Sequence, residues 1–197
     1  MRHATNNDFF TVGSSTYRIC QKPKKRGIET HALKQVVGQV ESMLSYHSKL
    51  IVIRFDLKVW EFTLDNKDIT TFNRRLFKWL KSRYELKRIG FVWCREIEKA
   101  KKQHYHYALI LDGHKVRHSE LIINKAKSIW EQFQRHLYVP KNCYHPIKRN
   151  DFSSIQGAIY RLSYLAKARG KGYKPAQTKN YGTSRIEHND KRRTAPA

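Results

Sequence analysis

The sequence feature that most constrains the fold is an apolar run over residues 103–111 that contains the triplet His104-Tyr105-His106. Its composition is typical of a β-strand, in which successive side chains point to opposite faces of the sheet. The two histidines, at positions i and i+2, then share one face and lie roughly 7 Å apart along the strand. Both imidazoles could reach one metal ion. An ordinary half-buried strand with histidines on its wet face would give the same pattern.

A second apolar and aromatic run, residues 89–98, precedes the histidine strand and ends in Glu96 and Glu98. Only the short polar segment 99–102 separates the two runs, and a connection of this length is typical of a β-hairpin. The hairpin would place a carboxylate beside the histidine pair.

Further patterns predict a mixed order of helices and strands. Residues 50–58 alternate apolar and polar side chains as a half-buried strand does. Apolar side chains recur at helical spacing from residue 30, over 65–84 and over 119–137. Residues 138–151 have few regular features and room for one more strand.

This order fits an α+β fold of the ferredoxin-like kind. In such a fold, helices cover one face of an antiparallel sheet of about five strands and leave the other face open. The side chains expected on the open face are Arg54, Asp56, Glu96, Glu98, His104 and His106. A face with these side chains is typical of a site rather than of a core.

The charge of the chain indicates a polyanionic partner. Its 40 Lys and Arg residues against 16 Asp and Glu residues give a formal net charge of +24. Nucleic acid is the default partner for such an excess. A cationic membrane-surface protein would show a basic amphipathic helix or a lipidation signal, and the N-terminal residues show neither. No apolar run is long enough for a membrane span or a signal peptide, so we expect a cytoplasmic protein without a membrane partner.

The chain divides by composition into three parts. Residues 1–30 are polar and basic and are expected to form a mobile or loosely packed arm. Residues 31–170 carry the helical and strand patterns of one domain. Residues 171–197 form a basic tail, whose glycines and lysines suit a flexible arm on DNA phosphates.

Residues 153–169 have the pattern of a helix with two different sides. Its apolar residues fall on one side, whereas Tyr160, Tyr164 and Lys167 fall together on roughly the opposite side. Core tyrosines would join the apolar stripe, and these two do not. A tyrosine hydroxyl can act as a covalent nucleophile, so the pair is a candidate for catalysis.

Three of these features together resemble the HUH endonucleases. They are the His-Tyr-His strand, a glutamate eight residues before its first histidine, and the Tyr-x-x-x-Tyr-x-x-Lys pattern on a later helix. Within that superfamily the chain is similar to rolling-circle replication initiators, above all the filamentous-phage (inovirus) gene 2 proteins and prophage relatives of the YagK/YfjJ type. The resemblance covers about residues 48–170, and the Tyr-Gly-Thr-Ser-Arg segment at 181–185 also fits this group.

The resemblance implies a metal centre, with a divalent metal ion as the cofactor. His104 and His106 would be metal ligands, with Glu96 as the third ligand and Glu98 as its alternative. By ligand softness, two imidazoles and a carboxylate suit zinc or another late transition metal. The family is usually supported by magnesium or manganese, and manganese is the easier fit to nitrogen ligands.

The resemblance also implies how the chemistry is divided. Tyr164 would attack the phosphorus of a single DNA strand and leave a 5′-phosphotyrosine link, Tyr160 would act in the second step that closes the circle, and Lys167 would stabilise charge at the phosphate. The residues that would contact DNA are Arg54, Asp56, Lys171, Lys174 and Arg185.

The implied partners are single-stranded or supercoiled origin DNA and a helicase. The chain has no Gly-x-x-x-x-Gly-Lys-Ser/Thr loop, so the helicase would be supplied in trans by the bacterial host. Residues 31–170 would then be an HUH endonuclease domain. Two alternatives stay open: a transposase or relaxase of the same superfamily, and a non-catalytic RNA- or single-strand-binding module whose aromatic residues stack on bases.

Overall fold

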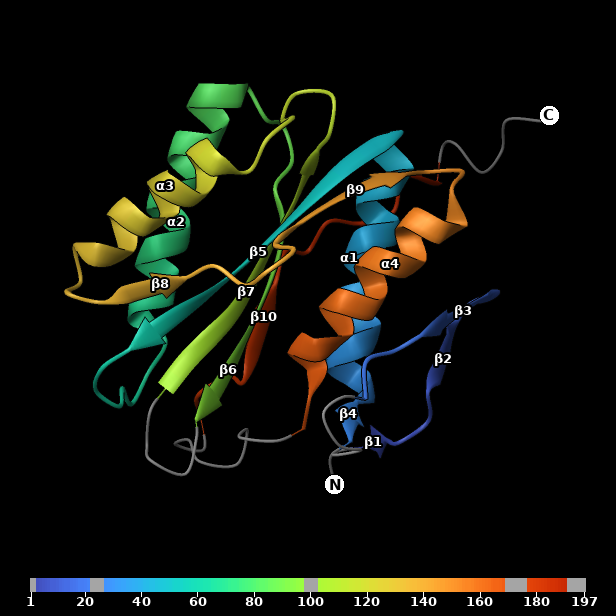
Figure 1. Ribbon diagram of the computed structural model, residues 1–197, viewed down its shortest axis with the longest axis horizontal. Helices are drawn as coiled ribbons and strands as arrows, with labels where there is room; N and C mark the ends of the chain where they lie inside the picture. Colours follow the sequence, from blue (N-terminus) through green and yellow to red (C-terminus); the bar gives the residue numbers. More distant parts are fainter. Residues whose placement is uncertain (1–2, 22–26, 98–102, 169–176, 191–197) are drawn as a thin grey trace.

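A six-stranded antiparallel sheet forms the centre of the molecule (Figure 1). The structure is a computed structural model that describes residues 3–21, 27–97, 103–168 and 177–190. Its strands are β1 (Ala4–Thr5), β2 (Phe9–Val12), β3 (Ser15–Arg18), β4 (Ile28–Glu29), β5 (Lys49–Val59), β6 (Gly90–Ile97), β7 (Gln103–Asp112), β8 (His136–Tyr138), β9 (Tyr144–Lys148) and β10 (Tyr181–Thr183). Its helices are α1 (Thr30–Tyr46), α2 (Lys67–Tyr84), α3 (Glu120–Glu131), α4 (Phe152–Leu162) and the 3-10 helix η1 (Ser163–Ala166).

The long strand β5 organises the sheet. The strand order is β10-β6-β7-β5-β8. β9 pairs with the first half of β5, at residues 49–53, and β8 pairs with residues 56–58. The strands predicted at 50–58, 89–98 and 103–111 are confirmed within one or two residues of their ends. The expected helix over 119–137 ends at Glu131, and Leu137 belongs to β8 instead. β9 is the one further strand that was expected within residues 138–151, and β8 takes the place of the end of the predicted helix.

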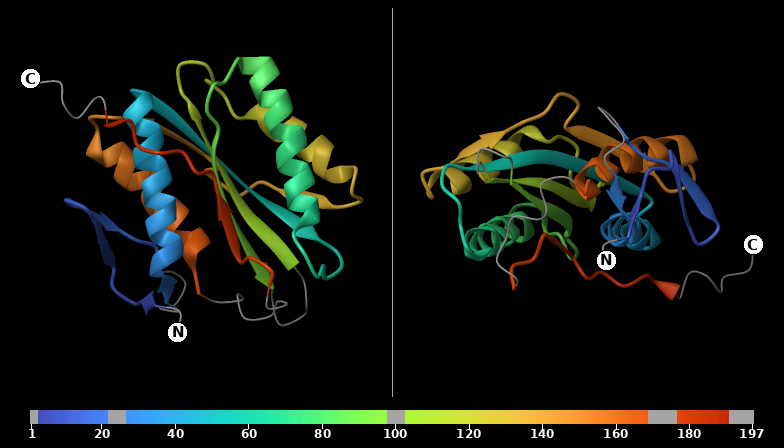
Figure 2. Two further views of the ribbon diagram at one scale, coloured as in Figure 1. Left: turned by 180° about the vertical axis from the view of Figure 1, so that it is seen from behind. Right: turned by 90° about the horizontal axis from the view of Figure 1, so that it is seen from below.

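Helices cover both faces of the sheet, which corrects the expectation of one covered and one open face (Figures 1 and 2). On one face, α2 and α3 pack on the odd-numbered side chains of β5 and β7, such as Phe55 and Tyr107. On the other face, α1 and α4 pack on side chains such as Val52 and Ile110.

The physical reason for this correction lies in how the polar residues are distributed along the strands. On the α1 and α4 face, the side chains of Val52, Val92, Ala108 and Ile110 are apolar and fully buried. The histidines of these strands and most of their charges lie toward the opposite end of that face, at positions such as Asp56, Glu96, His104 and His106. Apolar positions on both sides of a strand need cover on both sides, so the polar site takes up one end of the face.

The N-terminal residues are more ordered than the expected arm, as far as the structure describes them. β2 and β3 form a hairpin, and β1 pairs with β4. Tyr17, Ile19 and Ile28 are buried in the core with α1 and α4. The side chain of Gln156 accepts a hydrogen bond from the Arg18 amide (2.8 Å) and donates one to the Arg18 carbonyl (2.9 Å). The division of the chain at residues 30 and 170 stays a prediction.

The pairing of β10 with β6 explains why the 181–185 segment has a glycine at position 182. Gly182 lies opposite Trp93 of β6, and a Cβ atom at Gly182 would lie 2.5 Å from Trp93 Cε2. The Trp93 indole is buried and packs edge-on against Tyr105, 5.6 Å between ring centroids. The segment therefore requires glycine at this position for close approach.

Gly182→Ala is expected to lower the stability of the fold by about 1–3 kcal/mol, because the buried indole must shift to make room. For a chain of this size the melting temperature should fall by about 3–10 °C in a thermal unfolding experiment. Gly157→Ala on α4 is the matched control, since a Cβ atom there meets nothing within 4 Å. An equal effect of the two changes would contradict the proposed role of Gly182.

Among the described helices, none is long and apolar enough to cross a membrane.

Candidate metal and tyrosine site

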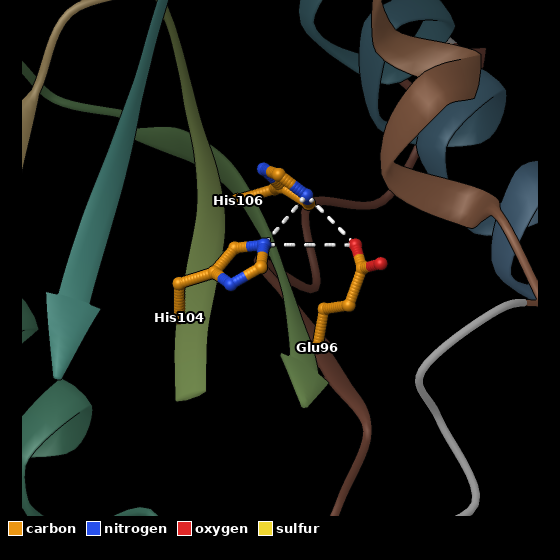
Figure 3. Close-up of side chains that lie close together, drawn as sticks. All are labelled: Glu96, His104 and His106. Carbon is orange, nitrogen blue, oxygen red and sulfur yellow. Dashed lines mark hydrogen bonds and ion pairs between the residues drawn. The ribbon is translucent and has the colours of Figure 1, made fainter. Parts of the chain in front are cut away.

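Glu96, His104 and His106 meet on the α1 and α4 face of the sheet, at one end of β6 and β7 (Figure 3). The register of the hairpin pairs Glu96 directly with His104, and the alternation of β7 places His106 on the same face. His106 Nε2 lies 2.9 Å from Glu96 Oε2 and 3.2 Å from His104 Nε2, and His104 Nε2 lies 3.6 Å from Glu96 Oε2. The structure thus brings together three of the residues that the sequence singled out as ligands.

A fourth side chain, Asp56 of β5, fixes the orientation of His106. Asp56 is the register partner of His106 on the other side of β7, and His106 Nδ1 lies 2.8 Å from Asp56 Oδ1. Because an ionised carboxylate can only accept, the Nδ1 of His106 carries the proton. When the ring is neutral, its Nε2 lone pair points into the Glu96 and His104 cluster. A carboxylate behind a histidine in this way is typical of metal-binding histidines.

The electrostatics of the cluster follow from the close contact of carboxylates and imidazoles. Burial alone would raise the pKa of Glu96 and Asp56, but their hydrogen bonds with the histidines lower the pKa of both carboxyls below the usual value. Burial alone would lower the pKa of His106, but its contacts with Asp56 and Glu96 raise it. Both carboxylates are therefore ionised at neutral pH, and the cluster offers negative charge to a cation.

The donor set fits a divalent metal ion. Ligand atoms about 2.1 Å from one ion lie about 3.0–3.5 Å from one another in common geometries, and the observed separations of 2.9–3.6 Å are close to this range. Two imidazole nitrogens and one carboxylate oxygen suit zinc, manganese or another transition metal better than they suit magnesium, which prefers all-oxygen sites. Three protein ligands also leave positions for a substrate oxygen or water.

Tyr164 lies directly beside this cluster. Its ring centroid is 5.1 Å from that of His106, in an edge-on arrangement. The Arg54 guanidinium carbon lies 4.7 Å from the centroid of the Tyr164 ring, and Lys167 Nζ lies 3.8 Å from it. Desolvation, followed by the charge of Glu96, raises the pKa of Tyr164, so the hydroxyl keeps its proton at neutral pH.

The helix that carries Tyr164 is shorter than the 153–169 pattern indicated. Regular α4 ends at Leu162, and the chain continues as the 3-10 helix η1. Lys167 follows η1 in an extended conformation, its side chain is largely buried, and its backbone bridges to Ile28. The change of helix type brings both Tyr164 and Lys167 to the cluster end of the sheet.

Tyr160 lies one turn earlier and has different neighbours. It is half-buried beside Cys20, and desolvation, followed by this contact, raises the pKa of its hydroxyl. Of the two tyrosines, Tyr164 is the one in ring contact with a histidine of the cluster.

The residues expected to contact DNA lie in different surroundings. Arg54 is largely buried between Asp56, 3.8 Å away, and Tyr164. Asp56 is engaged with His106, which gives it a role in positioning that histidine. Arg185 is exposed just after β10. Glu98, Lys171 and Lys174 lie outside the described residues.

One residue near the site was missed by the sequence analysis. Arg95 is 1 % exposed and lies on the face of β6 opposite to Glu96. Its guanidinium donates to the carbonyls of Thr63 and Asp65 and to Gln103 Oε1. A signal was present, because Arg95 shares its strand face with Phe91, Trp93 and Ile97. A charged residue in an apolar face needs buried partners.

The comparisons with known proteins give one match. The family model of the YagK/YfjJ C-terminal domain matches residues 14–184, which is most of the chain. No curated protein and no solved structure matches. The matched region includes the Glu96, His104 and His106 cluster, Tyr164 and the β10 segment. The chain belongs to the YagK/YfjJ C-terminal domain family.

Proposed function

We propose that this protein is a metal-dependent endonuclease of the HUH type that nicks and rejoins single-stranded DNA. The observation that carries the proposal is the contact of the Tyr164 ring with His106. A potential nucleophile thereby lies beside a histidine of a cluster whose donor set fits a divalent cation. Arg54 and Lys167 add positive charge around the same tyrosine.

The topology supports this proposal. β5, α2 and β6 form a crossover in which β7 lies between the two strands, and α3 returns the chain to the other side of β5. A crossover of this kind is typical of the split β-α-β unit and so favours a ferredoxin-like fold. The resemblance implies an antiparallel sheet of about five strands, and in the six-stranded sheet of the structure the histidine strand β7 lies between β6 and β5.

The reaction assigns a task to each residue near Tyr164. The Tyr164 oxygen forms a bond to phosphorus as the bond from phosphorus to the 3′ oxygen breaks. The proton lost from the tyrosine hydroxyl is balanced by the one gained by the 3′ oxygen, which leaves a 5′-phosphotyrosine link and a free 3′ hydroxyl. Glu96, His104 and His106 would hold a divalent cation, which would supply Lewis acidity at the phosphate. Arg54 and Lys167 offset the negative charge of the phosphate. Asp56 holds the His106 ring in place throughout.

The biological setting that we propose is rolling-circle replication. Nicking at an origin, followed by rejoining, converts one DNA strand into a circle, and Tyr160 would serve the second step. The DNA would be a phage or prophage origin in a bacterial cell, and a host helicase would separate the strands. The net charge of +24 favours such a polyanionic partner.

The test is a covalent adduct between protein and DNA. Mixing the protein with labelled single-stranded oligonucleotides from candidate origins and manganese should give a band that resists detergent and boiling. EDTA should prevent its formation. An adduct formed equally well by His104→Ala, or by the Tyr160→Phe, Tyr164→Phe double variant, would contradict the proposal. Metal-independent binding without any adduct would instead favour a non-catalytic nucleic-acid-binding module.

A further inference from the structure

The loop between β5 and α2 exposes three large apolar side chains within five residues. Trp60 is 69 % exposed, Phe62 is 40 % exposed and Leu64 is 70 % exposed. Scattered exposed apolar residues are ordinary on a protein surface, whereas a local group of them indicates a contact surface. None of the three belongs to the two core clusters of the described residues.

Partly buried hydrogen bonds hold the backbone of this loop in place. The Arg95 guanidinium, itself 1 % exposed, donates to the carbonyls of Thr63 and Asp65. The Thr63 amide donates to Gln103 Oε1 (3.1 Å), and Thr178 Oγ1 donates to the Leu64 carbonyl (2.7 Å). Hydrogen bonds at several points along the loop reduce the conformational entropy that binding would otherwise cost. The apolar side chains are thus presented on a rigid support.

The loop lies at the same end of the sheet as the metal and tyrosine site, although Arg95 and Gln103, which hold it, lie on the opposite face. It starts directly after β5, whose Lys58 is the register partner of His104, so Trp60 is two residues beyond that pair. Gln103, which accepts a hydrogen bond from the Thr63 amide, precedes His104 in the chain. In Figure 1 the loop follows the arrowhead of β5, at the same end of the sheet at which β6 ends and β7 begins.

The surroundings of the loop favour a nucleic acid strand as its partner. A hollow of about 690 Å³ beside it is lined by Leu64, Asp65, Lys67 and Lys179 together with the uncharged polar residues Asn66, Thr70, Thr71, Gln177 and Thr178. Asp65 forms an ion pair with Lys67, 3.2 Å apart. Phe62 lies against the Arg95 guanidinium, 5.4 Å from its ring centroid. Aromatic side chains next to cationic ones are the usual components of surfaces that bind single strands.

We infer that the loop over residues 60–64 binds unpaired nucleobases of single-stranded DNA, with Trp60 as the main stacking residue. The inference builds on the proposed function, because it assigns bases of the same DNA strand to this loop, at the end of the sheet where the metal and tyrosine site lies. Stacking requires bases that are free of a duplex, so the loop would favour single strands over double strands. It adds a base-binding element outside the residues that hold metal or react.

The experiment measures DNA binding without chemistry. A fluorescent single-stranded 30-mer of mixed sequence is titrated with the full chain carrying Tyr164→Phe, in EDTA, and anisotropy gives the dissociation constant. On this background Trp60→Ala should weaken binding about 5- to 100-fold, the range found for the loss of one base-stacking residue. Phe62→Ala should have a smaller effect, and Trp60→Phe should retain most of the affinity because its ring still stacks.

Controls separate stacking from other causes. Phe9→Ala removes an aromatic ring that is 58 % exposed in β2. In Figure 1, β2 lies at the right and the loop after β5 at the lower left, so this change should leave the affinity unchanged. Affinity for the corresponding duplex should change less than twofold with Trp60→Ala. Unchanged single-strand affinity in both Trp60→Ala and Phe62→Ala would overturn the inference, as would a change in self-association alone. These outcomes do not depend on adduct formation, so failure of the nicking proposal would be seen separately.

Discussion

Tyr164→Phe is expected to abolish the covalent protein–DNA adduct. The change removes only the hydroxyl and keeps the ring beside His106 and Arg54, so the fold and DNA affinity should hold. Loss of a nucleophile lowers the rate by about three orders of magnitude or more in comparable cases. The measurement is the rate at which labelled single-stranded DNA forms a protein adduct that survives detergent, in the presence of manganese.

Tyr160→Phe is the matched control for this prediction. It removes the same hydroxyl one turn earlier on the chain, beside Cys20. With this variant the first adduct should form at a rate close to that of the unchanged protein, while release of a joined circular product should fail. If Tyr164→Phe keeps the adduct and Tyr160→Phe loses it, the assignment of Tyr164 as the first nucleophile is wrong.

Manganese or zinc is expected to stabilise the folded protein through the Glu96, His104 and His106 cluster. A ligand that binds only the folded state adds about 2.7 kcal/mol at a concentration one hundred times its dissociation constant. For a chain of this length that corresponds to a rise in melting temperature of about 5–10 °C. Differential scanning calorimetry with and without metal measures the shift, and EDTA should reverse it.

His104→Ala should remove this stabilisation, because the cluster then has two ligands in place of three. His136→Ala is the control: His136 is an exposed histidine on β8, paired with Lys58 on the other side of β5 from His104. Asp56→Asn should keep the three ligands yet weaken metal binding about 10- to 100-fold, since the contact that orients His106 is weakened. A metal-induced shift that persists in His104→Ala would place the metal elsewhere.

Local patterns predicted the strands and the members of the cluster well. The alternation of apolar and polar residues placed β5, β6 and β7, because the side-chain period of a strand is a property of the strand itself. The short connection predicted a carboxylate beside the histidine pair but left Glu96 and Glu98 as alternatives, and the register of the structure pairs Glu96 with His104. The apolar stripe of α4, including Ile155 and Ile159, was also predicted and is buried.

Long-range packing decided what those patterns could not. The sequence did not predict that α1 would pack beside α4 on the site face, because helix periodicity shows which side of a helix is apolar and not which surface covers it. The tasks of Asp56 and Arg95 likewise depend on neighbours 50 and 30 residues away, His106 and Asp65.

The sequence by itself determined the chemistry available: a histidine pair on one face of a strand, a glutamate on the strand before it, two tyrosines with a lysine, and a strong positive charge. Only the tertiary structure decided which of these groups meet. It brought Tyr164 to His106 through the end of α4 and the 3-10 helix η1, while Tyr160 stayed beside Cys20. The reason is physical: a contact between segments more than fifty residues apart depends on how whole helices pack on the sheet, and local periodicity carries no information about that packing.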